Sequence, residues 1–149
     1  MLTTLLNEMD GMQSREGVLV LAATNKPEIL DAALMRPGRF DAMLYVGPPN
    51  LEARLQILQM QCKDRPVEEG LDLEELAGVT EGYSGAEMVE ICNEAARAMV
   101  RDCLRNESWE RIGRAHFERA MEKVVRGITG EMVEKYRRWS RDRGIASFA

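Results

Sequence analysis

Residues 17–25 read Gly-Val-Leu-Val-Leu-Ala-Ala-Thr-Asn, an apolar run that ends in polar residues. A continuous run of this kind predicts a strand that is buried on both faces, as in parallel sheets, over residues 17–24. Residues 43–46, Met-Leu-Tyr-Val, predict a second short strand. Because one pair of strands is not stable alone in water, we expect this sheet to need more strands than the chain supplies.

Between these two strands, residues 36–41 read Arg-Pro-Gly-Arg-Phe-Asp and place two arginines three positions apart. Pro37 stiffens this loop, while Gly38 gives it conformational freedom. A guanidinium on such a loop is suited to stabilising the negative charge of a phosphoryl group, often across a subunit boundary. The alternative, a turn with two solvated arginines, stays open from these six residues alone.

From residue 47 onward the pattern is entirely helical. Residues 47–50, Gly-Pro-Pro-Asn, mark a boundary, and their last residue is suited to cap the helix that follows. Asp72 opens a short helix, and Ser84 opens a long one with Glu87 three residues later, which predicts a capping box. Apolar residues at helical spacing predict two further helices, over residues 115–125 and 130–141.

The chain therefore divides into an α/β part followed by an all-α part. We expect residues 1–47 to end a parallel-sheet subdomain, residues 48–142 to form a small bundle of four or five helices, and residues 143–149 to be a flexible tail. Residues 1–10 have helical spacing without an N-cap signal, as we expect of a fragment that begins inside an element.

The charge of the chain is unevenly distributed. Residues 1–100 carry 8 Lys/Arg against 17 Asp/Glu, whereas residues 101–149 carry 12 against 8. A basic C-terminal third is typical of contact with nucleic acid or with an acidic neighbour. Acidic residues are interspersed with these arginines and no aromatic platform accompanies them, so we do not expect direct nucleic-acid binding.

The remaining composition excludes several classes of protein. The three cysteines show no CxxC spacing and are typical of the reduced thiols of a cytoplasmic or nuclear protein. With His116 as the single histidine, we expect no metal site and a capping or packing role for this residue. No apolar run approaches the roughly 18 residues of a membrane span, and we expect no signal peptide and no membrane partner.

Ordered blocks along nearly the whole chain resemble the AAA family of ATPases. They read Leu-Asn-Glu-Met-Asp-Gly (6–11), Ala-Ala-Thr-Asn-Lys-Pro (22–27), Asp-Ala-Ala-Leu-Met-Arg-Pro-Gly-Arg-Phe-Asp (31–41), Tyr-Ser-Gly-Ala-Glu (83–87) and His-Phe-Glu-Arg-Ala-Met (116–121). Within the family, the chain is similar to the second module of tandem-module ATPases of the valosin-containing-protein and spermatogenesis-associated types. The resemblance implies the end of a P-loop NTPase-type sheet subdomain followed by a complete helical lid.

The resemblance also implies roles for residues of the first part. Asn25 matches the polar residue that ends the central strand beside the γ-phosphate and helps to orient the attacking water, because an amide both donates and accepts hydrogen bonds. Arg36 and Arg39 match arginine fingers, which reach the nucleotide of a neighbouring subunit and raise its hydrolysis rate by about 10³ to 10⁵. Asp31 and Asp41 either orient these arginines or cap the loop.

In the lid, Gly85 and Ala86 match the small residues that let a helix approach the adenosine part of the nucleotide. Their place at a helix N-terminus favours an anion, since free N–H groups and the positive end of the dipole lie there. Tyr83 matches a position that contacts the ribose or base, and a packing role in the core or hinge is an equal alternative.

The chain contains no G-x-x-x-x-G-K-S/T phosphate loop (Walker A) and no apolar strand that ends in paired Asp-Glu (Walker B). Glu8 and Asp10 are not replacements, because they follow a helical pattern. ATP and Mg²⁺ are implied for the complete module, and we expect the isolated chain neither to bind ATP tightly nor to hydrolyse it.

The parent protein implied by the resemblance is a homo-hexamer of AAA subunits that remodels proteins or ribonucleoprotein particles, with ribosome maturation as one such process. A non-catalytic interaction module that docks on complete AAA subunits is the alternative.

Overall fold

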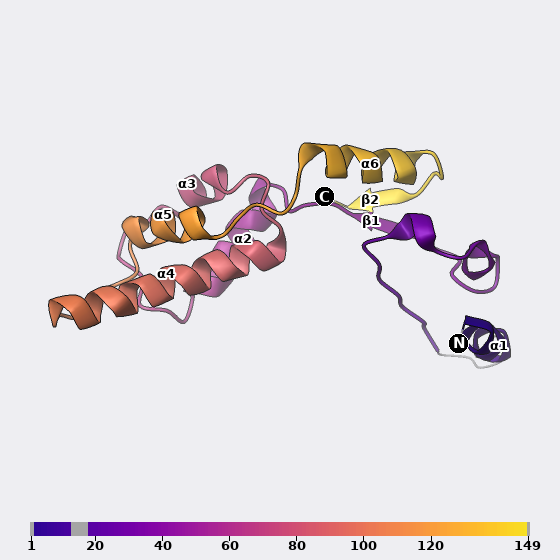
Figure 1. Cartoon of the computed structure of the whole chain (residues 1–149), viewed down its shortest axis with the longest axis horizontal. Coiled ribbons are helices and arrows are strands. Elements are labelled where there is room, and N and C mark those ends of the chain that lie inside the picture. Colours follow the sequence, from indigo (N-terminus) through magenta and orange to yellow (C-terminus); the bar gives the residue numbers. More distant parts are fainter. Residues whose placement is uncertain (1, 13–17, 149) are drawn as a thin grey trace. The chain divides into compact units, whose positions relative to one another are not determined.

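The computed structural model describes residues 2–12 and 18–148. Its backbone forms two compact units, one that ends at Leu44 and one that begins at Tyr45. Figure 1 labels the helices and strands of both units, which are described here one at a time.

Over its described residues, the first unit contains one α-helix and two short 3₁₀ turns. Helix α1 spans Leu2–Met12, η1 spans Pro27–Ile29 and η2 spans Ala32–Met35. The helix predicted at residues 1–10 is present from Leu2 and runs to Met12, while Met1 lies outside the described residues. Among the residues of this unit whose burial is described, Met9 alone is buried, with 4 % of its surface exposed.

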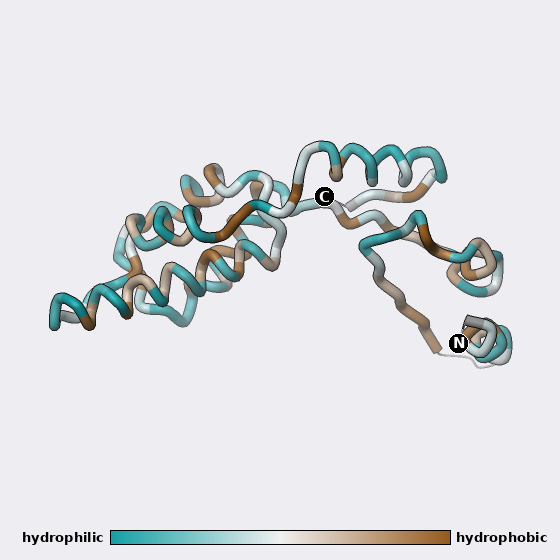
Figure 2. The backbone as a smooth tube through the Cα atoms, viewed as in Figure 1, coloured by the Kyte–Doolittle hydropathy of each residue, from teal (hydrophilic) through white to brown (hydrophobic). Residues whose placement is uncertain are grey.

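The strand predicted at residues 17–24 is absent from the part of it that the structure describes, residues 18–24, while Gly17 lies outside the described residues. This segment is extended but unpaired, and Leu19 and Leu21 are 85 % and 87 % exposed. In Figure 2 the extended segment that leads from α1 is coloured hydrophobic over its first residues. A strand needs neighbours for its backbone N–H and C=O groups, and none of the described strands pairs with this one.

The two described strands pair with each other, and all of their residues except Leu44 belong to the second unit. Strand β1, Leu44–Val46, falls within the predicted segment 43–46, and it pairs with β2, Ala146–Phe148. We expected a flexible tail at residues 143–149, so β2 is a correction. The reversal that brings β2 back follows the end of a helix: Gly144 adopts a φ of +63°, and the Ile145 N–H donates to the Ser140 carbonyl at 3.0 Å.

Five helices make up the rest of this unit. They are α2 (Leu51–Cys62), α3 (Leu73–Val79), α4 (Gly85–Asn106), α5 (Arg114–Lys123) and α6 (Gly130–Arg141). The predicted caps are confirmed, since the side chains of Asn50, Asp72 and Ser84 each accept a backbone N–H of the helix that follows. Helix α6 has the bounds that we predicted, and α5 lies within two residues of its predicted range.

Helices α2 to α5 enclose the hydrophobic core of the second unit. Helix α4 packs against α2 and α5, and α2 packs against α3, whereas the main partner of α6 is β2. The largest fully buried core side chains include Leu58, Met88, Ile91 and Phe117. The three cysteines are free thiols, with Cys92 buried and the other two half-buried, as we expected. Among the described residues, no helix is both long and apolar enough to cross a membrane.

Candidate functional site

The loop of residues 31–41, called the arginine loop below, is held by bonds within itself. The Asp31 carboxylate accepts the Ala33 N–H at 2.8 Å and so caps η2, and the Asp41 carboxylate accepts the Gly38 N–H at 2.6 Å. Gly38 has a φ of +90°, which favours glycine. The two aspartates therefore cap the loop, which is one of the two roles that we predicted for them.

Arg39 is bound within its own unit through all three nitrogens of its guanidinium. Its Nε and Nη2 donate to the two carboxylate oxygens of Asp10 on α1, each at 2.8 Å, and its Nη1 donates to the Ala33 carbonyl at 2.7 Å. The side chain is 16 % exposed. The hydrogen bonds from Arg39 hold the pKa of Asp10 below its usual range, and the same bonds raise the pKa of Arg39.

Arg36 differs from Arg39 in every one of these respects. It is exposed and ends η2 in an extended conformation, with φ −74° and ψ 146°. Its carbonyl accepts the Arg39 N–H at 3.2 Å, which fixes its backbone. Within residues 2–12 and 18–148, its guanidinium forms neither an ion pair nor a hydrogen bond.

Asn25 lies directly after the extended segment of residues 18–24. It is exposed and occupies a bend, next to a turn in which the Thr24 hydroxyl accepts the Lys26 N–H at 3.0 Å. Asn25, Arg36 and Arg39 all belong to the first unit.

In the second unit, the N-terminus of α4 carries the other predicted residues. Ser84 and Glu87 form the predicted capping box, with the Ser84 N–H donating to the Glu87 carboxylate at 2.6 Å. The second oxygen of Glu87 accepts the Gly127 N–H at 2.7 Å, so this carboxylate also ties the segment after α5 to the start of α4. Burial acts to raise the pKa of Glu87, but the hydrogen bonds from Ser84 and Gly127 outweigh it and lower that pKa.

Gly85 and Ala86 form the first turn of α4 and are only partly covered. Gly85 is half-buried and Ala86 is exposed. In the described part of the chain, no acceptor binds their backbone N–H groups. A Cβ at position 85 would meet only the Ile57 Cδ1 atom, at 3.9 Å, which is an ordinary van der Waals contact. Packing between described residues therefore leaves room for a side chain at position 85.

Tyr83 lies in the core beside this turn, with 4 % of its surface exposed. Its hydroxyl donates to the Met121 carbonyl at 3.2 Å, and the Arg126 guanidinium lies 4.9 Å from the centre of its ring. These contacts correspond to the packing role, the alternative that we gave for this residue.

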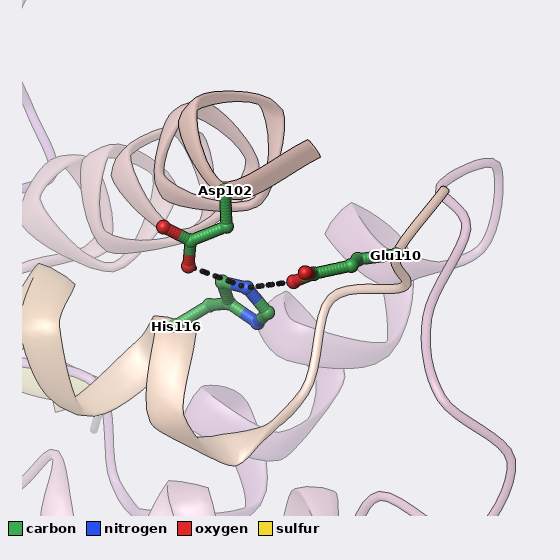
Figure 3. Close-up of side chains that lie close together, drawn as sticks. All are labelled: Asp102, Glu110 and His116. Carbon is green, nitrogen blue, oxygen red and sulfur yellow. Dashed lines mark ion pairs between the residues drawn. The ribbon is translucent and has the colours of Figure 1, made fainter. Parts of the chain in front are cut away.

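A third cluster joins Asp102 of α4, Glu110 of the following loop and His116 of α5 (Figure 3). The Nε2 atom of His116 lies 3.4 Å from Asp102 and 3.8 Å from Glu110, and it has no hydrogen-bond partner among the described residues. Two carboxylates and an imidazole are a donor set that suits a divalent transition metal.

The protonation of the ring argues against a metal in this cluster. The Nδ1 atom of His116 accepts the Gly113 N–H at 2.9 Å, so the lone pair of the neutral ring lies on Nδ1 and its proton on Nε2. A metal ion at Nε2 would need a lone pair on that atom, which the proton occupies. In addition, the Asp102 carboxylate that would be its second ligand already pairs with Arg119. His116 therefore caps the start of α5, which confirms the structural role that we predicted for it.

Two residues that hold these sites were not predicted from the sequence to do so. Asp10 fixes Arg39 across 29 positions of sequence, and its helical pattern gave no sign of this contact. Gly127 donates its N–H to the Glu87 carboxylate, and a Cβ at this position would lie 2.6 Å from the accepting oxygen. The position of this glycine two residues after the end of the helix predicted at residues 115–125 was the available signal.

Two family models match separate segments of the chain. Residues 1–48 match the model of the ATPase family associated with various cellular activities (AAA), and residues 70–118 match that of the AAA+ lid domain. These matches confirm the predicted fold class, an α/β part followed by an all-α part.

Several curated relatives align with most of the chain. The ATPase family gene 2 protein of Saccharomyces cerevisiae is 48% identical over 147 residues, which are 98% of this chain and 18% of that protein. The cell division cycle protein 48 homolog of Archaeoglobus fulgidus is 39% identical over 148 residues, which are 93% of this chain and 20% of that protein. The ATP-dependent zinc metalloprotease FtsH 2 of Thermoanaerobacter sp. is 46% identical over 127 residues, 85% of this chain and 24% of the relative.

The chain thus spans less than a quarter of the length of each of these relatives. With an AAA segment at residues 1–48, an AAA+ lid segment at residues 70–118 and relatives of the Cdc48 type, the chain belongs to the AAA family of ATPases.

Proposed function

We propose that this chain is part of an ATPase that couples ATP hydrolysis to the remodelling of proteins or ribonucleoprotein particles, ribosome maturation among them. The observation that carries the proposal is the arginine loop: its backbone is fixed by its own hydrogen bonds, and the exposed guanidinium of Arg36 has no partner among the described residues. In this role the loop serves the nucleotide of a neighbouring AAA subunit, and the parent assembles as a homo-hexamer.

The chemistry of phosphoryl transfer explains why such a loop is useful. Negative charge spreads over the γ-phosphoryl oxygens in the transition state, and a delocalised guanidinium that is already in place stabilises it with little reorganisation. Asn25, in the same subunit as the nucleotide, orients the attacking water through its amide. ATP and Mg²⁺ are the cofactors of the complete module.

The start of α4 is proposed to cover the adenosine part of the nucleotide. The N–H groups of Gly85 and Ala86, for which the described residues provide no acceptor, suit an electron-rich ligand, and the small side chains allow close approach. The space around position 85 supports this proposal, because the described residues give no packing reason for a glycine. Tyr83 supports the turn from the core.

The exposed apolar segment at residues 18–21 supports a larger parent. Four consecutive apolar side chains, from Val18 to Leu21, are between 38 % and 87 % exposed. A strand in the middle of a parallel sheet would bury them, so we propose that further strands of an AAA large subdomain flank this segment. The same region would supply the phosphate loop and the paired acids that these 149 residues lack.

The test uses two materials, the isolated chain and the complete module. We expect no tight, Mg²⁺-dependent binding of ATP to the isolated chain by calorimetry. In the complete module, Arg36→Ala is expected to lower turnover about 10³-fold while ATP binding persists. Arg137→Ala, at an exposed arginine of α6, is the matched control and should leave turnover unchanged.

Two results would contradict the proposal. Tight ATP binding by the isolated chain would show that the nucleotide site does not need the rest of the AAA module. Near-normal turnover of Arg36→Ala would refute a role for the loop in hydrolysis. If the isolated chain instead binds a complete AAA ATPase and changes its turnover, the interaction-module alternative is favoured.

A further inference from the structure

The two arginines of the arginine loop differ in what they are free to do. Arg39 uses all three guanidinium nitrogens within its own unit, two on Asp10 and one on the Ala33 carbonyl. To reach a phosphate it would have to leave a carboxylate and a carbonyl without their donor. The fork of a guanidinium on a carboxylate is among the strongest side-chain pairings, so this departure is costly.

Arg36 bears no such cost, because its guanidinium is exposed and unpaired among the described residues. Its backbone is nevertheless fixed, since its carbonyl accepts the Arg39 N–H at 3.2 Å and the loop closes through the Phe40 N–H on the Leu34 carbonyl, also at 3.2 Å. The contacts that fix Arg39 therefore also fix the backbone of Arg36, because the two residues share this hydrogen bond.

Asp10 connects this loop to a different element of the same unit. It lies on α1, 29 positions before Arg39, and it is the only carboxylate that pairs with Arg39 among the described residues. The bidentate contact fixes the direction of the Arg39 side chain as well as its distance, which a single hydrogen bond does not.

We propose that Asp10 and Arg39 are positioning residues that fix the arginine loop, and that Arg36 is the arginine that reaches the phosphoryl group of the neighbouring subunit. This inference rests on the proposed function. It assigns contact with the phosphoryl group to Arg36 and the positioning of the loop to Arg39. Displacing Arg36 by about 1 Å is enough to cost on the order of 10²-fold in rate, so the positioning pair matters to hydrolysis without touching the nucleotide.

The test is a set of variants in the complete module, with kcat and KM for ATP measured separately. Asp10→Asn keeps the size of the side chain and removes its charge, and we expect kcat to fall about 10- to 100-fold at an unchanged KM. Asp10→Glu, which keeps a carboxylate, should restore most of this loss. The double variant Asp10→Asn/Arg39→Ala should be no slower than Arg39→Ala, because both changes break one contact. Unchanged ATP binding and an unchanged melting temperature would separate this effect from general unfolding.

One pattern would overturn the inference: normal kcat in Asp10→Asn together with a loss in Arg39→Ala as large as that in Arg36→Ala. Arg39 would then touch the phosphate itself. A different result would contradict the proposed function itself. Near-normal turnover in Arg36→Ala would mean that the loop has no role in hydrolysis, whatever the kcat of Asp10→Asn.

Discussion

The two units of this chain bury their apolar residues very differently. In the first, Leu19 and Leu21 are 85 % and 87 % exposed, and the arginine loop is held by hydrogen bonds among polar groups. In the second, Leu58, Met88 and Ile91 have no exposed surface, and four helices close around them. The second unit therefore has a core that its own helices close, whereas the apolar side chains of residues 18–21 in the first unit are not covered by any of the described residues.

The largest expected effect comes from making one substitution in both units. Leu58→Ala removes a fully buried side chain of α2 and is expected to lower the free energy of unfolding by about 2–5 kcal/mol. Leu19→Ala, the matched control, is expected to change it by less than about 0.5 kcal/mol, because that side chain is already in water. Urea denaturation followed by circular dichroism measures both. Equal losses in the two variants would mean that the segment at residues 18–21 is buried in solution.

A second prediction concerns the carboxylate that joins the start of α4 to the segment after α5. Glu87→Gln retains one acceptor oxygen for two N–H donors, so we expect it to lower the free energy of unfolding by about 1 kcal/mol at neutral pH. The pKa of Glu87 is lowered in the folded state, so its contribution is complete above its ordinary value of 4.5 and is lost as the pH falls below it.

The measurement is a series of denaturation curves for Glu87→Gln and the original chain between pH 7 and pH 3. The difference between them should shrink as the pH falls below 4.5. Glu131→Gln is the matched control, since Glu131 lies in the first turn of α6 in the same way but is exposed. A difference that is constant with pH would show that the carboxylate of Glu87 does not carry this stability.

These sites also show what sequence alone can predict. The capping box of Ser84 and Glu87 depends on two residues three positions apart, and a local pattern is enough to find it. The contact between Asp10 and Arg39 depends on where α1 lies against the loop, and no spacing encodes that placement. Strand β2 was missed for a related reason, because it exists only where Gly144 reverses the chain and β1 accepts it as a partner.

The smallest effect on stability is expected for a substitution at Gly85. This substitution distinguishes a glycine needed for packing from one needed for binding the nucleotide. Gly85→Ala places a Cβ at an ordinary 3.9 Å from Ile57, and alanine suits the first turn of a helix, so the free energy of unfolding should change by less than about 0.5 kcal/mol. In the complete module the same methyl group would occupy the surface that we assign to the adenosine, and KM for ATP should rise. Gly78→Ala is the matched control, since a Cβ there meets no atom within 4 Å. Because neither substitution disturbs the core, a rise in KM that appears only in Gly85→Ala assigns this turn of α4 to the nucleotide, and equal KM values in both variants remove it from the site.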